Sequence, residues 1–292
     1  MDTRVLKYFL TVARTNNITQ AATQLHITQP TLSRQIMELE DEIGTPLFDR
    51  SERRLKLTKA GVLFQSRATA ILNMIDQTKD ELKEENGVSG TISLGCVASS
   101  VSPLMMKMVG KFQEQYPGVK FRIYDGDGDV LRRLIDERRL DFACLIEPVE
   151  TAKYNGITLP ASDKWGILMK ASDPLAKLES LSADELYNLP LVVPHRNIVF
   201  NLVSDIMKVD EKKMNIKATA NLPSNMIELV RTGKYYALSI QSIIALFNDP
   251  DLAFVPIEPV KFTGHQMIWL RNEPQNFVSK LFLEFVKTQL KA

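Results

Sequence analysis

The 292-residue sequence contains only two cysteines, Cys96 and Cys144, and only three histidines. Two cysteines are too few for the disulfide framework of a secreted fold in a chain of this length. The three histidines, His26, His195 and His265, lack the close spacing that is typical of metal ligands. The sequence also has no phosphate-binding loop and no nucleophile motif. We therefore expect no metal, no cofactor and no catalytic site.

Long hydrophobic runs are absent as well. The longest candidate, residues 235–247, is interrupted by polar side chains and is shorter than the ~20 residues that a membrane-spanning helix needs. Arg4, Lys7 and Arg14 break up the apolar residues near the N-terminus, which therefore does not resemble a secretory signal. The composition, 45% hydrophobic and 24% charged, is that of a globular chain of about two domains. We expect a cytoplasmic protein that does not contact a membrane.

The sequence also lacks an excess of charge of one sign, because its 36 basic residues are nearly balanced by 35 acidic residues. The distribution of the charges is nevertheless uneven. Residues 50–59 hold five basic residues and one acidic residue, and residues 26–37 hold no acidic residue. Any contact with a polyanion is therefore expected to be local.

The first sixty residues predict three helices. Apolar residues at helical spacing indicate a helix over residues 2–15, and Thr19 is a candidate N-cap for a short helix over residues 20–25. Thr28 is a candidate N-cap for a third helix, over residues 29–43, which the following glycine would end.

The predicted third helix has the polarity of a helix that reads DNA. Its acidic residues all lie in its second half, while its first half is polar and basic. A helix that enters the major groove with its N-terminus first needs this order, because its leading residues meet the base edges. Residues 47–48 and 55–57 are expected to form two short strands around a basic turn, which would make a wing. An ordinary small helical core with a charged surface is the alternative interpretation.

A long helix is expected over residues 58–85, since no proline interrupts an apolar stripe there. Such a stripe is buried either against a second copy of the helix or against the body of the same chain. Beyond residue 91, strands alternate with helices in two successive sets, which indicates two parallel α/β units with a cleft between them.

Many residues of the N-terminal region match, at fixed spacing, the pattern of the LysR-type transcriptional regulator family, which this sequence closely resembles. The residues that carry this resemblance are Phe9, Val12, Ala13, Thr19, Ala21, Ala22, Leu25, Thr28, Gln29, Pro30, Thr31, Leu32, Ser33, Gln35, Ile36, Leu39, Glu40, Gly44, Leu47, Phe48, Arg50, Thr58 and Gly61. The C-terminal part resembles the effector-binding domain of the same family through Asp141-Phe142-Ala143, Asp173-Pro174-Leu175-Ala176 and Glu228-Leu229-Val230.

The resemblance implies an α/β protein with three parts. These are a winged helix-turn-helix over residues 1–60, a linker and dimerisation helix with a hinge over 61–88, and an effector-binding domain over 89–292. The last part would be bilobed, like periplasmic binding proteins, with lobe one formed by residues 89–161 and 265–292 and lobe two by residues 162–264.

The resemblance also implies three groups of site residues. Those expected to contact double-stranded DNA are Thr19, Thr28, Gln29, Pro30, Thr31, Ser33, Arg34, Gln35, Arg50 and Arg53. Those expected near a small effector are Ser99, Ser100, Ser102, His195, Arg196, Ser224 and Asn225. Those expected to form a dimer, or part of a tetramer, are Leu63, Ile71, Leu72, Ile75 and Leu82.

The expected effector is an organic anion, because free N–H groups at a helix start and an arginine favour a negative charge. The alternative is that the serines only cap a helix and that Arg196 is a solvated charge. The resulting prediction is a regulator that binds an interrupted inverted repeat and contacts RNA polymerase. A bifunctional enzyme with a DNA-binding head and a solute-binding protein are the alternatives from other classes.

Two further patterns are expected to be structural. Asp125, Asp127 and Asp129 alternate as in a calcium loop, but Val130 stands where such a loop needs glycine, so we expect helix caps. The two cysteines fall in predicted strands, and we expect them to be unreactive core thiols.

Overall fold

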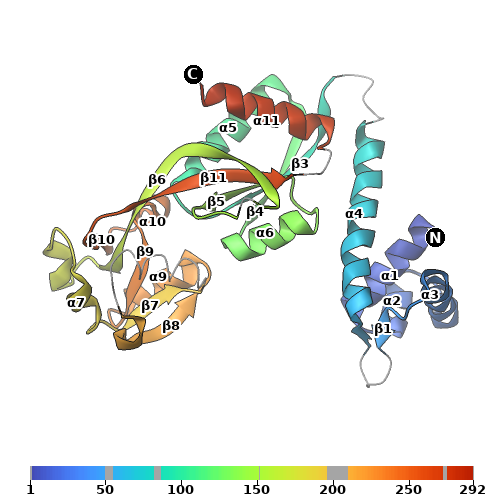
Figure 1. Ribbon diagram of the computed structural model, residues 1–292, viewed down its shortest axis with the longest axis horizontal. Coiled ribbons are helices and arrows are strands. Elements are labelled where there is room, and N and C mark those ends of the chain that lie inside the picture. The colour runs from blue at the N-terminus through green and yellow to red at the C-terminus, as the bar shows by residue number, and fades with distance from the viewer. Residues whose placement is uncertain are drawn as a thin grey trace. The chain divides into compact units, whose positions relative to one another are not determined.

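The computed structural model describes residues 2–49, 55–81, 87–150, 152–195, 210–271 and 275–291. The chain divides into two compact units, the first formed mainly by residues 1–90 and the second mainly by residues 91–292. Figure 1 shows the elements of both units, which are described separately below. Within the described ranges, no helix is long and apolar enough to cross a bilayer.

The first unit is a three-helix bundle with a two-stranded wing and one long helix. Its elements are α1 (Thr3–Thr15), α2 (Ile18–Gln24), α3 (Gln29–Ile43), β1 (Phe48–Asp49), β2 (Lys56–Leu57) and α4 (Lys59–Glu81). Phe9 of α1 lies at the centre of its core and is fully buried. The ring of Phe9 lies 5.2 Å from that of Phe48 and 4.8 Å from that of Phe64, so the wing and α4 share one core with the bundle.

The helix starts confirm one predicted cap and correct another. Thr28 caps α3, since its side chain accepts a hydrogen bond from the backbone N–H of Thr31. The prediction that Thr19 caps the second helix is wrong. Asn17 has extended backbone and accepts from the N–H of Gln20, so that Thr19 lies inside α2. Asparagine has a higher preference for the N-cap position than threonine, which explains why the helix begins two residues earlier.

The second unit contains one mixed β-sheet and the helices that connect its strands. Its strands are β3 (Ser89–Cys96), β4 (Gly118–Asp125), β5 (Phe142–Ile146), β6 (Tyr154–Lys170), β7 (Leu191–Pro194), β8 (Ile216–Ala220), β9 (Tyr236–Ile240), β10 (Leu252–Pro256) and β11 (Phe262–Leu270). Its described helices are α5 (Val101–Gln115), α6 (Gly128–Asp136), α7 (Ala183–Leu186), α9 (Pro223–Arg231), α10 (Ser242–Phe247) and α11 (Phe277–Gln289), with short 3₁₀ turns at Pro174–Lys177 and Glu211–Lys213. In the described residues the strand order is β4-β3-β5-β11-β6-β9-β7-β8, with β10 paired to β6.

Two long antiparallel strands, β6 and β11, connect the two lobes (Figure 1). The predicted parallel pairs are present, because β3 pairs with β5 and β7 pairs with both β8 and β9 in parallel. The crossing strands were not predicted: β6 begins at Tyr154 and pairs antiparallel with β11, β9 and β10.

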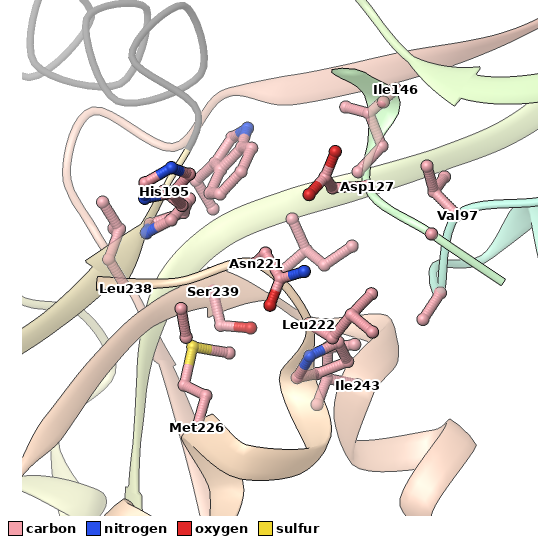
Figure 2. A pocket seen from close by; sticks show the side chains of 18 residues that line it. Val97, Asp127, Ile146, His195, Asn221, Leu222, Met226, Leu238, Ser239 and Ile243 are labelled. Carbon is pink, nitrogen blue, oxygen red and sulfur yellow. The ribbon is translucent and has the colours of Figure 1, made fainter. Parts of the chain in front are cut away.

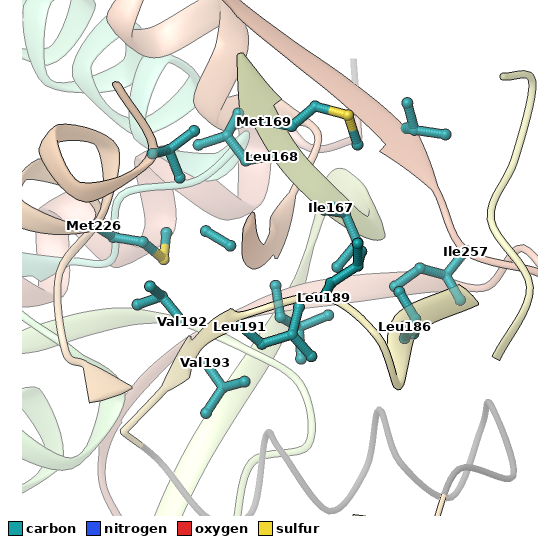
Figure 3. Packing of buried hydrophobic residues seen from close by; sticks show 14 of the residues in the cluster. Ile167, Leu168, Met169, Leu186, Leu189, Leu191, Val192, Val193, Met226 and Ile257 are labelled. Carbon is teal, nitrogen blue, oxygen red and sulfur yellow. The ribbon is translucent and has the colours of Figure 1, made fainter. Parts of the chain in front are cut away.

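Lobe two has its own hydrophobic core. Ile167, Leu168 and Met169 of β6 pack against Leu191 and Val192 of β7, and all five are almost fully buried (Figure 3). Methionine and leucine side chains from α7 and α9 complete the cluster. Because successive side chains of a strand point to opposite faces, this end of β6 is buried on both faces within lobe two, while its first part pairs with β11.

Candidate functional site

The start of α3 is an exposed polar segment that holds four of the predicted DNA-contacting residues. Thr28, Gln29, Pro30 and Thr31 are exposed, while the stripe of Leu32, Ile36 and Leu39 on the other side of the helix is buried. The buried stripe fixes the rotation of α3 about its axis. The leading turn is consequently presented to solvent with its donors and acceptors available.

Arg34 and Gln35 are held by one carboxylate of the same helix. The Arg34 side chain is 78% exposed, and its Nε donates to Glu38 Oε1 over 2.8 Å. Gln35 Nε2 donates to the other oxygen, Glu38 Oε2, over 2.6 Å. In the absence of DNA, Glu38 thus competes for two side chains that suit guanine and adenine edges.

Glu40 connects α3 to the wing, a role that the sequence analysis missed. Its Oε1 accepts hydrogen bonds from the backbone N–H groups of Leu47, over 2.7 Å, and Phe48, over 2.9 Å. On the other side of this segment, Thr58 Oγ1 donates to the carbonyl of Pro46. The position of the wing is therefore set by contacts between α3, the wing and the start of α4. The sequence pattern grouped Glu40 with the carboxylates that avoid DNA, and local spacing could not reveal its backbone partners.

The wing itself is a pair of two-residue antiparallel strands, as predicted. Arg50 and Arg53 lie outside the described residues. Thr19 is exposed on α2, where its carbonyl accepts from Thr23 Oγ1.

Helix α4 carries an exposed apolar stripe. Leu63 is 61%, Met74 53% and Ile71 38% exposed, at positions that share one face of the helix. Leu72 instead packs against the core of the first unit. Ile75 is half-buried, and Leu82 lies outside the described residues. Of the predicted dimerisation residues, Leu63 and Ile71 are thus the ones that α4 leaves exposed, and Met74 joins them.

A cavity of about 120 Å³ lies in the second unit, lined by both lobes (Figure 2). Val97, Asp127 and Ile146 come from lobe one, and His195 and Asn221 are among those from lobe two. Most of the remaining lining is apolar, with Trp165 and Met226 as large members. Such an apolar cleft with a few polar groups is the usual form of a small-molecule site.

The predicted effector residues are distributed around this cavity unequally. His195 lines it, and its Nδ1 lies 3.4 Å from Thr219 Oγ1. Ser224 and Asn225 lie in the first turn of α9, and the cavity is lined by Pro223, which begins this helix, and by Asn221 and Leu222 before it. Arg196 lies outside the described residues.

The three predicted serines at the start of α5 make hydrogen bonds within the chain, although the Ser100 hydroxyl has no partner among the described residues. Ser102 Oγ donates to the carbonyl of Val97 over 2.8 Å, and Ser99 Oγ accepts from the N–H of Val101. The backbone N–H of Ser100 donates to the carboxylate of Asp163 over 3.0 Å. The free N–H groups on which the expectation of an anion at this helix start depended are therefore already bonded within the chain.

Two other predicted features are structural. Asp127 Oδ1 accepts from the N–H groups of Asp129 and Val130 and so caps α6, as expected. Cys96 and Cys144 are buried free thiols at paired positions of β3 and β5. A hydrogen bond between them, together with burial, raises the pKa of Cys144 well above its usual value, and the same bond lowers the pKa of Cys96. Across the described residues, no three His, Cys, Asp or Glu side chains gather as a metal site would require.

Comparisons with known families match nearly the whole chain. Residues 3–62 match the model of the bacterial regulatory helix-turn-helix proteins of the lysR family, and residues 85–291 match the LysR substrate binding domain. The regulator BudR of Raoultella terrigena is 31% identical over 290 residues, which cover 97% of this chain and 99% of BudR. The regulator BsdA of Bacillus subtilis is 40% identical over 147 residues, which cover 49% of this chain and 50% of BsdA.

A solved structure of similar fold is that of full-length CbnR in complex with its target DNA. Its TM-score is 0.77 at 21% identity, and the match covers 99% of each chain. This likeness supports the overall architecture of head, long helix and bilobed domain.

Proposed function

The chain belongs to the LysR family of bacterial transcriptional regulators, and we propose that it binds DNA through the leading turn of α3. It is a DNA-binding transcriptional regulator with an effector-binding domain, in which residues 1–60 would form the head, 61–88 the linker and hinge, and 89–292 the bilobed sensor. The observation that carries the proposal is the exposed, acid-free first half of α3 above a buried apolar stripe.

Within the head, different residues are assigned different kinds of contact. Gln29, Thr31 and Arg34 would meet base edges, because they lie at the leading, exposed end of α3. Ser33, Gln35 and Pro30 would complete this surface. The phosphates would be held at Thr19 and Thr28 near the helix starts, and by Arg50 and Arg53 of the wing segment.

We propose that the regulator is a homodimer or homotetramer that recognises an interrupted inverted repeat. The exposed stripe on α4 supports the self-association, because Leu63, Ile71 and Met74 would be covered by a second copy of this helix. Two symmetric heads would then contact two half-sites of opposite orientation.

The interlobe cavity is proposed as the effector site. A small molecule there would contact lobe one through the Asp127 region and lobe two through His195 and the start of α9. An effector that fits one closure of the lobes better than another would shift the population of that closure, and through the oligomer the spacing of the heads. Since its target is DNA in a bacterial cell, we place the protein in the cytoplasm, where it would also meet RNA polymerase.

The DNA-reading proposal is tested by adding one acidic group to the leading turn. Thr31→Glu should weaken binding to every duplex about tenfold or more, because a carboxylate would enter the groove beside phosphates. Gln115→Glu makes the same change of charge on the exposed surface of α5 and should leave binding unchanged. Equal DNA binding by Thr31→Glu and the wild type, measured by fluorescence anisotropy, would show that the leading turn of α3 does not contact DNA.

A further inference from the structure

The side chain of Asp163 lies at the point where the two lobes join. Asp163 belongs to β6, where pairing with β11 extends up to Lys164 and pairing with β9 begins at Trp165. The residue is only 3% exposed. A buried carboxylate requires hydrogen-bond partners, so its contacts identify what it holds.

The two oxygens of this carboxylate bind different lobes. Oδ2 accepts from the backbone N–H of Ser100, directly before α5 of lobe one, over 3.0 Å. Oδ1 accepts from the backbone N–H of Ser242, the first residue of α10 in lobe two, also over 3.0 Å. A charged acceptor makes stronger hydrogen bonds than a neutral one, particularly away from water. One side chain therefore connects the starts of two helices that belong to opposite lobes.

A third element, β11, closes the cluster through His265, which is fully buried. The ring Nδ1 lies 3.0 Å from the carbonyl of Ala161 and must carry a proton there, because a carbonyl only accepts. Nε2 then lies 3.5 Å from Asp163 Oδ2 and, like the serine hydroxyls described next, has no hydrogen-bond partner among the described residues. The pairing of β11 with β6 shifts in register directly before this residue, between Gly264 and His265.

The same two serines also bring hydroxyl groups that are not satisfied. Ser100 Oγ and Ser242 Oγ are buried and have no hydrogen-bond partner among the described residues. Unsatisfied buried donors cost free energy and call for a physical explanation. Each hydroxyl belongs to the same serine as one of the two N–H donors. If one lobe turned relative to the other, a hydroxyl could donate a hydrogen bond to the Asp163 carboxylate in place of the N–H.

We infer that Asp163 is the positioning residue of the effector-binding domain: its carboxylate fixes the relative placement of the two lobes by binding the N–H groups of Ser100 and Ser242 together. Its consequence for DNA binding rests on the proposed function, whereas the placement of the lobes does not. Turning one lobe would break one of these bonds and allow a serine hydroxyl to replace it.

The test compares Asp163→Asn with Asp141→Asn in the full-length protein. An amide can accept only through its oxygen, so Asp163→Asn loses one of the two interlobe bonds. Asp141 is the matched control, because its oxygens accept from the N–H of Ser93 and from Ser279 Oγ, which both belong to lobe one. Thermal unfolding establishes that each variant is folded.

The readout is the distance between spin labels on Glu114→Cys of lobe one and Lys217→Cys of lobe two, both exposed positions. Each labelled chain is diluted with unlabelled protein, so that only distances within one chain are measured. Asp163→Asn should broaden or shift the distance distribution, while Asp141→Asn should leave it as in the wild type. An unchanged distribution in a folded Asp163→Asn protein would overturn the inference.

Hydrogen exchange provides a second, independent measurement on the same variants. Exchange at the backbone N–H that loses its acceptor, that of Ser100 or that of Ser242, should be about tenfold faster in Asp163→Asn, and both should be unchanged in Asp141→Asn. If both N–H groups stay as protected as in the wild type, Asp163 does not hold them. Failure of the proposed DNA binding would leave both measurements interpretable, because neither uses DNA or an effector.

Discussion

Gly61 and Leu47 approach each other so closely that no side chain fits between them. A Cβ on Gly61 would lie 2.0 Å from the carbonyl oxygen of Leu47. Gly61 is in the first turn of α4, and Leu47 precedes the wing. The contact fixes the long helix against the wing, and thereby fixes the wing relative to α3, to which Glu40 binds it.

Gly61→Ala should therefore destabilise the first unit by about 1–3 kcal/mol, the usual cost of inserting an atom into a packed region. Binding to specific DNA should fall with it, since the wing would move. Gly110→Ala is the matched control: Gly110 lies within α5 with no atom near its added Cβ, and the change should stabilise by up to about 1 kcal/mol. Chemical unfolding of the two variants measures both effects. Equal stability of Gly61→Ala and the wild type would contradict the contact.

Arg34→Ala should weaken specific DNA binding by about 1–3 kcal/mol and relax one base preference. Glu38→Gln should instead strengthen specific DNA binding, because it removes the carboxylate that binds Arg34 and Gln35 in the free protein. Binding of both variants is compared on a selected duplex and on a random duplex. An equal loss on both duplexes for Arg34→Ala would make Arg34 a phosphate contact rather than a base contact.

The cysteines should not react while the protein is folded. Both are buried, and the raised pKa of Cys144 keeps it a thiol at neutral pH, whereas the reactive form is the thiolate. Cys96 has a lowered pKa but is only 2% exposed. A chromogenic disulfide reagent should therefore label no thiol in the native protein and both in denaturant. Rapid labelling of the native protein would contradict this prediction, because it would show that β3 and β5 separate often enough to expose the thiols.

Binding of a small molecule in the cavity should change tryptophan fluorescence, because Trp165 lines the cavity and the chain has only two tryptophans. In Trp269→Phe, all tryptophan emission comes from Trp165. Small molecules that raise the unfolding temperature of this variant should also change its emission. A stabilising molecule that leaves the emission of Trp165 unchanged would bind elsewhere and argue against the cavity as the effector site.

The sequence predicted the features that depend on local pattern. The buried stripe of α3, its cap at Thr28 and its end before Gly44 follow from periodicity and capping preference within a few residues. Thr19 was misassigned because Asn17, a residue equally suited to capping, stands two positions earlier.

Features that join distant parts of the chain were not predictable from the sequence in this way. The long crossing strands, β6 and β11, pair residues about a hundred positions apart, so neither strand reveals its partner. The bonds of Glu40 to the wing and of Asp163 to two helix starts are likewise set by the fold. Ser100, which was expected near the effector, likewise donates its backbone N–H to a carboxylate that is distant in the sequence.

The central claim is sequence-specific binding of DNA by a symmetric oligomer. It is tested most directly by selecting bound duplexes from sheared genomic DNA with the purified full-length protein and footprinting the recovered fragments. We expect an interrupted inverted repeat that is protected over several helical turns. Recovery of nothing above random DNA, at low salt and with folded protein, would contradict it.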